Sequence, residues 1–227
     1  MRVLVVSPHY DDAPMSVGES LLHGDLRSER VTVGVVFGRS NWVKYFHPTT
    51  RRWPLATAIR FMEEVVNASR FRYRVRVASL PEWILRTGIA ETAEYLDQAR
   101  DVSADPLVDE VYRVLLRWSR RADLILVPLG VGGHVDHLIV AAAGRRLADS
   151  RRPVRFYEDR PYACWLDDEA LTAAALVTVP HGAPSPISGP IGGRKRDLIW
   201  YPSQVGGFFD EAIGLDETRQ RCERVWE

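Results

Sequence analysis

The sequence predicts an α/β protein with a Rossmann-like, mostly parallel sheet flanked by helices. Three short runs of Val, Ile and Leu have the continuous apolar character of strands buried on both faces: residues 2–6, 31–37 and 124–127. Segments with helical spacing of apolar residues lie between them. Strands that alternate with helices form right-handed parallel units. Because no linker or internal repeat divides the 227 residues, we expect a single domain over 1–227.

The amino-terminal elements follow this alternation. The first strand, residues 2–6, leads into a helix over 16–26, and Pro14 and Ser16 suit the first helical turn. After the second strand, the segment 38–55 is too long and too rich in aromatic residues for a plain connector. We expect this segment to cover the substrate; a contact with a second copy in a homo-oligomer is the alternative.

The middle of the chain continues the alternation, and the carboxyl-terminal part departs from it. In order, the patterns predict a helix over 58–70, a strand over 71–77, a partly helical segment over 81–100, a helix over 105–118, the third buried strand, a helix over 138–147 and a strand over 154–157. The run 174–179 then predicts a last strand, although its Ala-rich start fits a helix equally well. The Gly-, Pro- and Ser-rich segment 181–193 predicts a mobile loop, and 216–226 predicts a final helix.

The composition is that of a soluble globular protein without a polyionic partner. Hydrophobic residues make up 46% and charged residues 26%, and 30 basic residues balance 30 acidic ones. This balance gives no electrostatic reason to expect nucleic acid or a membrane surface as a partner. No apolar run approaches the ~20 residues that span a bilayer. Because the chain begins almost directly with a strand, we expect no signal peptide and a cytoplasmic location.

Two clusters of histidine and aspartate follow strongly apolar strands. The first comprises His9, Asp11 and Asp12, and the second comprises His134, Asp136 and His137. Because the carboxyl ends of parallel strands meet at one edge of a sheet, the two clusters are expected to converge. Imidazole and carboxylate form a common ligand set for a divalent transition metal. Helix capping also explains each cluster alone, but it accounts less well for two clusters at equivalent positions.

A set of motifs extends over nearly the whole chain. It consists of His9-x-Asp11-Asp12, His134-x-Asp136-His137 and the weaker pieces Arg60-x-x-Glu63, Tyr157-Glu158-Asp159-x-Pro161-Tyr162 and Lys195 before Tyr201-x-Ser203-Gln204. Together they resemble the LmbE/PIG-L family of zinc-dependent N-deacetylases. The resemblance implies metal-dependent hydrolysis of an N-acyl group. The implied substrate is a small molecule, with N-acetyl on an amino sugar or a glycosylated natural-product intermediate as the first candidate.

The resemblance also implies a metal site. His9, Asp12 and His137 correspond to the ligands of a zinc ion, and Fe(II), Mn or Co would fit the same donor set. Such a zinc site keeps one open position for a water molecule, whose pKa falls to about 7.

The other three members of the two clusters correspond to catalytic residues. Asp11 matches the general base, which takes a proton from the water and later delivers one to the departing amine. His134, in its protonated form, is expected to stabilise the tetrahedral oxyanion. Asp136 is expected to orient His134 and to favour its charged form.

Three further residues are expected to contact the substrate. Arg60 corresponds to a substrate-binding residue, although a salt bridge to Glu63 or Glu64 on the helix surface explains it as well. Tyr10 stands where the family's commonest first motif has proline, and adds a contact near the substrate. Trp42 lies in the long aromatic segment and either stacks on a sugar ring or packs in the core or an interface.

The sequence departs from the family pattern at two other positions. Ala13 replaces a glutamate of the first motif, which alters the support around the metal site. Gly132 stands where some members have a tyrosine, so stabilisation of the transition state is expected to rest more heavily on His134 and the metal.

Three other functions remain open at this point. The same machinery would also serve a non-sugar N-acyl substrate, such as a thiol conjugate. A catalytically inactive metal-binding relative is the second alternative, and the presence of Asp11 and His134 argues against it. A nucleotide-binding protein is the third, and the lack of G-x-G-x-x-G after the first strand argues against that function.

Overall fold

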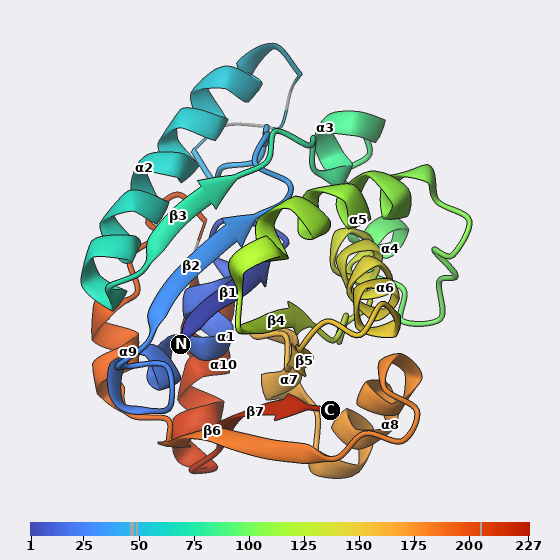
Figure 1. Cartoon of the computed structure of the whole chain (residues 1–227). Coiled ribbons are helices and arrows are strands. Elements are labelled where there is room, and N and C mark those ends of the chain that lie inside the picture. Colours follow the sequence, from blue (N-terminus) through green and yellow to red (C-terminus); the bar gives the residue numbers. More distant parts are fainter. Residues whose placement is uncertain (46–47, 49, 205) are drawn as a thin grey trace.

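The computed structural model describes residues 1–45, 48, 50–204 and 206–227. Within these residues, seven strands form one sheet in the order β3-β2-β1-β4-β5-β7-β6 (Figure 1). The strands are β1 (Arg2–Ser7), β2 (Arg30–Val35), β3 (Arg74–Val77), β4 (Leu124–Pro128), β5 (Val154–Tyr157), β6 (Pro184–Pro190) and β7 (Cys222–Trp226). Strands β3, β2, β1, β4 and β5 are parallel, whereas β7 runs antiparallel to both β5 and β6. The predicted α/β fold with a mostly parallel sheet is confirmed.

Helices cover both faces of the sheet (Figure 1). One face carries α1 (Asp12–His23), α2 (Trp53–Phe71) and α9 (Gly193–Leu198), and the other carries α5 (Pro106–Trp118), α6 (Val135–Asp149) and α8 (Asp168–Thr178). The shorter or peripheral helices are α3 (Trp83–Thr87), α4 (Thr92–Tyr95), α7 (Tyr162–Trp165) and α10 (Gly207–Thr218), with 3-10 turns η1 (Thr50–Arg52) and η2 (Ser119–Arg121). No helix of the described residues is long and apolar enough to cross a membrane.

Strand β1 is central because its side chains alternate between two hydrophobic cores. Val3 and Val5 belong to the core that includes residues of α1 and α2. Leu4 and Val6 belong to the core that includes residues of α5 and α6. A strand in this position is buried on both faces, which explains its continuous apolar sequence.

Most elements of the first 160 residues form as predicted. The first helix begins earlier than expected, at Asp12, directly after the histidine and aspartates of the first motif. Of the segment 38–55, residues 46, 47 and 49 lie outside the described residues. Its first part packs against the chain near α2: Ser40 N–H donates to Thr57 Oγ1 at 2.9 Å, and Lys44 N–H donates to Ser203 O at 2.9 Å. Contact with a second copy stays a prediction.

Three predictions in the carboxyl-terminal part are wrong. The strand over 174–179 is not formed, and the helical alternative for its Ala-rich start is confirmed, since residues 174–178 belong to helix α8, which Asp167 initiates by accepting the Ala170 N–H at 2.8 Å. The expected loop 181–193 contains strand β6, whose prolines are tolerated because β6 is an edge strand. The expected helix 216–226 is instead the end of α10 followed by β7.

Strand β7 is tied to helix α1 through one buried carboxylate. Helix α1 is kinked at Val17, where the backbone leaves helical geometry. Beyond the kink, the N–H groups of Glu19 and Ser20 donate to the carboxylate of Glu223 at 2.9 and 2.7 Å. Lys195 Nζ lies 2.7 Å from the same carboxylate and is buried with it. The end of the chain therefore stabilises the helix that begins at the first motif.

Candidate active site

The two predicted clusters meet at the carboxyl edge of the sheet. Strands β1, β4 and β5 are neighbours in the sheet and end at Ser7, Pro128 and Tyr157. The first cluster follows β1 and opens α1, and the second follows β4 and opens α6. Convergence at this edge is the position where open α/β sheets bind their ligands.

His9, Asp12 and His137 form a compact buried group. The carboxylate of Asp12 lies between the two rings, with Oδ2 at 3.4 Å from His9 Nδ1 and Oδ1 at 3.3 Å from His137 Nε2. One ligand atom from each residue lies within 4.8 Å of the others. Ligand atoms bonded to a tetrahedral zinc ion lie about 3.3 Å apart. The spacing and the donor set therefore fit a divalent transition metal.

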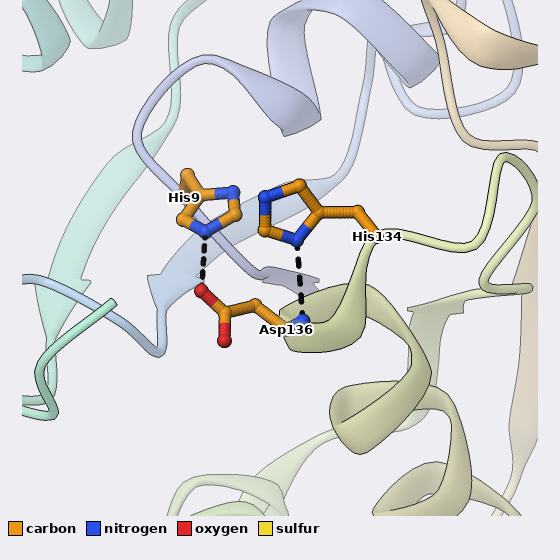
Figure 2. Close-up of side chains that lie close together, drawn as sticks. All are labelled: His9, His134 and Asp136. Carbon is orange, nitrogen blue, oxygen red and sulfur yellow. Dashed lines mark hydrogen bonds and ion pairs between the residues drawn. The ribbon is translucent and has the colours of Figure 1, made fainter. Parts of the chain in front are cut away.

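Buried carboxylates hold the second nitrogen of each ring. His9 Nε2 lies 3.0 Å from Asp136 Oδ2 (Figure 2), and His137 Nδ1 lies 2.7 Å from Asp159 Oδ1. Burial lowers the pKa of both imidazoles, but the carboxylates outweigh it and raise the pKa to about 9 for His9 and about 10 for His137. Carboxylates in this position fix the tautomer and orientation of a metal-ligating imidazole. Metal binding here would release protons.

Asp159 was not predicted from the sequence to have a functional role of its own. Its Oδ2 also accepts two backbone N–H groups of the loop after β4, at 2.8 and 3.0 Å. The available signal was its position just after β5, at the same sheet edge as the two clusters.

The expected pairing of the Asp136 carboxylate with His134 is replaced by other contacts. The carboxylate of Asp136 contacts His9, accepts the Trp83 N–H at 3.0 Å and lies 2.6 Å from Arg86 Nη2. His134 instead caps α6, since its Nδ1 accepts the backbone N–H of Asp136 at 3.2 Å (Figure 2). Asp136 therefore positions His9.

The surroundings of His134 favour its neutral form, in contrast to the protonated ring expected from the sequence. Burial, reinforced by the charge on His9, lowers the pKa of His134 well below its usual value. Because Nδ1 accepts a hydrogen bond, the neutral ring carries its proton on Nε2. His134 lines the cavity and retains one N–H to donate.

Asp11 lies beside the metal-ligand candidates at the start of α1. Burial and the neighbouring Asp12 raise the pKa of Asp11, while the Arg60 guanidinium, with Nη2 at 3.6 Å, opposes the shift. A carboxylate with a raised pKa is a stronger base, which suits proton transfer near neutral pH.

Arg60 is held by three groups of the protein. Its Nε donates to Gln204 Oε1 at 2.6 Å, and its Nη1 donates to Ser40 Oγ and Glu82 Oε2, both at 2.7 Å. The alternative salt bridge to Glu63 or Glu64 is absent from the described residues. Arg60 is 5% exposed and lines the cavity, so its Nη2 is directed at Asp11 while the rest of the group is fixed.

The catalytic candidates line a cavity of about 350 Å³. Its walls are apolar and largely aromatic: Trp42, Trp83, Ile84, Tyr95, Leu96, Tyr162, Phe208 and Phe209. Phe208 is 52% exposed and stacks on Trp165, with ring centroids 5.4 Å apart. A polar floor with apolar walls suits a small molecule that carries a polar reacting group.

The chain is similar in sequence to a known deacetylase. It is 33% identical over 238 residues to the 2'-N-acetylparomamine deacetylase of Streptomyces fradiae, and the match covers 99% of this chain and 81% of that protein. The chain belongs to the LmbE/PIG-L family of N-deacetylases. No protein-family model matches the chain.

Solved structures of deacetylases share the fold. A deacetylase of teicoplanin biosynthesis aligns with a TM-score of 0.63 at 20% identity, covering 100% of this chain and 97% of that one. A zinc-inhibited form of teicoplanin deacetylase aligns with a TM-score of 0.63 at 19% identity, with the same coverage. N,N'-diacetylchitobiose deacetylase from Pyrococcus horikoshii aligns with a TM-score of 0.52 at 12% identity, covering 100% and 82% of the two chains.

Of the remaining substrate-contact predictions for this N-deacetylase, Trp42 lies in the cavity wall and Tyr10 does not. The side chain of Tyr10 is 1% exposed, and its hydroxyl donates to Gly38 O at 2.7 Å. Tyr10 therefore fastens the first motif to the chain after β2, in place of the predicted contact with the substrate.

The space beside Gly132, where some family members have a tyrosine, is filled by another ring. A Cβ atom on Gly132 would lie 2.3 Å from Cγ of Tyr162, and Gly132 has a φ of +88°. Tyr162 packs edge-on against His137, with ring centroids 5.7 Å apart at 88°. Tyr162 thus occupies in space the place that the glycine leaves open.

Proposed function

We propose that this protein is a metal-dependent hydrolase that removes the acetyl group from an N-acetylated amino sugar of a natural-product intermediate. The observation that carries the proposal is the group of His9, Asp12 and His137 at ligand spacing, next to the cavity that Asp11 and His134 line. Membership of the N-deacetylase family supports the reaction. Because the Streptomyces fradiae relative is named for 2'-N-acetylparomamine, that compound is the first substrate to test.

We assign the metal ligands to His9, Asp12 and His137, with zinc as the first candidate metal. Zinc bound there would lower the pKa of a water molecule to about 7 and polarise the amide carbonyl. Asp136 and Asp159 hold the two imidazoles so that His9 Nδ1 and His137 Nε2 face the Asp12 carboxylate and would be free to bind the ion.

The chain's own groups then move the protons of the reaction. Asp11, with its raised pKa, takes the proton of the attacking water and delivers a proton to the leaving amine. The Nε2–H of neutral His134 donates to the amide oxygen as negative charge develops on it. The aromatic walls, including Trp42, contact the body of the substrate.

We regard residues 1–227 as a single domain, because one sheet contains strands from both ends of the chain.

Metal content and amine release from the same preparation test this function. Protein loaded separately with Zn²⁺, Fe²⁺, Mn²⁺ or Co²⁺ is assayed on N-acetylated amino sugars and on non-sugar N-acetyl amides. We expect near-stoichiometric metal and release of amine from an amino sugar. Metal without turnover on any sugar, but with turnover on another amide, would replace the substrate class. Failure to bind any of the four metals would refute the proposal.

The variant His137→Ala tests the ligand assignment. We expect loss of bound metal and of activity together, since one of three ligands is removed. His181→Ala, at an exposed position, is the matched control and should leave both unchanged. Normal metal content with normal turnover in His137→Ala would remove His137 from the ligand set.

A further inference from the structure

The carbonyl of Tyr10 lacks the hydrogen-bond donor that a helix would give it. In an α-helix this carbonyl would accept the N–H of the residue four positions later, which is Pro14 and has no N–H. The N–H of Ala13 is already donated to Ser7 Oγ at 3.1 Å. The hydroxyl of Tyr201, 2.8 Å away, supplies the hydrogen. Because a buried carbonyl without a partner is costly, we take this bond as fixed.

The number of hydrogens available to these hydroxyl and carboxyl groups then determines the protonation state of Glu64. A tyrosine hydroxyl has one hydrogen, and Tyr201 uses it on the Tyr10 carbonyl. The Tyr201 oxygen also lies 2.7 Å from Glu64 Oε2, a separation that requires a hydrogen between the two oxygens. Only Glu64 can provide it. The other oxygen, Oε1, accepts the hydroxyl of Tyr73 at 3.0 Å.

We propose that Glu64 is a protonated carboxylic acid and a positioning residue, the first donor in a chain from Glu64 through Tyr201 to the carbonyl of Tyr10. This chain fixes the backbone between His9 and Asp11, and its link to catalysis rests on the function proposed above. Neither Glu64 nor Tyr201 lines the cavity, so both act through the first motif.

The surroundings of Glu64 agree with a neutral acid. Burial, together with the charges of Asp11 and Asp12, raises the pKa of Glu64 to about 8, although the neighbouring hydroxyls of Tyr201 and Tyr73 oppose the shift. Among the described residues, no salt bridge supplies Glu64 with a cation. The adjacent Glu63 differs, because it accepts three hydrogen bonds from Ser203 and Gln204.

Ionisation of Glu64 would break the series of hydrogen bonds from Glu64 through Tyr201 to the Tyr10 carbonyl. A carboxylate can only accept, so the Tyr201 hydroxyl would turn to Glu64 and leave the Tyr10 carbonyl without a donor. The folded protein holds one proton that the unfolded chain releases near pH 4.5, and loses it near pH 8. Between these values the folding equilibrium constant is expected to fall by up to tenfold per pH unit from this group, and to level off above pH 8.

Three variants test the proposal. In Glu64→Gln the amide N–H replaces the acid hydrogen, so the hydrogen bond to Tyr201 is retained and the side chain cannot ionise. We expect Glu64→Gln to retain kcat near pH 7 and to lose the part of the alkaline decline in kcat and stability that Glu64 causes. Glu64→Leu and Tyr201→Phe each remove one of these hydrogen bonds. We expect kcat to fall tenfold or more at every pH in both variants, with little change in KM. Glu169→Gln, at an exposed position, is the control.

Two readouts need no substrate and separate this proposal from the proposed function. The infrared difference spectrum of wild type minus Glu64→Gln at pH 6 should contain the carbonyl band of a protonated carboxylic acid. The slope of unfolding free energy against pH should be reduced in Glu64→Gln. A spectrum without that band and an unchanged slope would overturn the protonated state, whatever the activity assay gives. Wild-type kcat in folded Glu64→Leu or Tyr201→Phe would overturn the positioning role.

Discussion

At the scale of single residues, the two candidate imidazole ligands differ in how they are supported. His9 is held by Asp136, which is itself bound by Arg86 and a backbone N–H. His137 is held by Asp159, which accepts two backbone N–H groups of the loop after β4. Each ring is thus connected to a different neighbouring segment, and the proposed metal site would depend on both.

Changing Asp159 to asparagine should weaken metal binding. The substitution keeps the size of the side chain but removes the charge that orients His137 Nδ1–H, and such changes typically cost 10- to 100-fold in metal affinity. Competition with a chromophoric zinc chelator measures the affinity. Asp149→Asn, exposed near the end of α6, is the control. Equal affinities in the two variants would contradict the role of Asp159.

Asp11→Asn should separate catalysis from metal binding. Loss of a general base typically lowers the rate by ~10²-fold or more, whereas Asp11 is outside the ligand group and the metal should remain. Metal analysis and kcat are measured on one preparation, beside the exposed control Asp25→Asn. Turnover at the wild-type rate would exclude Asp11 as the base.

The members of the site were predictable at this scale, but their partners were not. His9 and His134 are identified by their positions just after buried strands, because topology alone brings such positions together. Asp136 pairs with His9, and Asp159 pairs with His137. These pairings depend on the directions of the side chains at the start of α6 and after β5, which the sequence does not specify. Burial of His134, which lowers its pKa, likewise follows only from the assembled site.

At the scale of elements, the loop between β4 and α6 is shaped by glycine. Gly132→Ala places a Cβ into the Tyr162 ring at a backbone φ of +88°, which strains any other residue. We expect a loss of about 2 kcal/mol or more in unfolding free energy, measured by urea denaturation, with reduced kcat. Gly189→Ala has open space and an ordinary φ, and should change stability little. Similar stabilities for the two variants would refute this account.

The two strands that the sequence patterns failed to predict, β6 and β7, were missed for different physical reasons. Strand β6 pairs on one side only, so its prolines and glycine, typical of loops, do not prevent strand formation. In β7 the buried Glu223 interrupts the apolar pattern that would indicate a strand. Local patterns are reliable for central strands such as β1, because burial on both faces demands an apolar sequence there.

At the scale of the whole molecule, β7 and α9 stabilise the first helix. Glu223→Ala would leave the N–H groups of Glu19 and Ser20 without their acceptor and the charge of Lys195 buried and unpaired. Removing one partner of a buried ion pair costs about 3–5 kcal/mol, and we expect a loss of this size in unfolding free energy. Glu227→Ala, which removes an exposed pair with Arg155, should cost about 1 kcal/mol or less. Equal losses of unfolding free energy in Glu223→Ala and Glu227→Ala, measured by urea denaturation, would contradict the stabilising role of Glu223.

The distance along the chain between the two halves of the site has a consequence for biosynthesis. His9 and Asp136 touch although 127 positions separate them, and Asp159 lies further still toward the carboxyl terminus. A ribosome therefore releases the first motif long before the residues that complete the ligand group. The nascent chain therefore carries His9 and Asp12 before His137 has been synthesised, and with the proposed ligand set a metal ion would be bound by three ligands only late in translation or in the released protein.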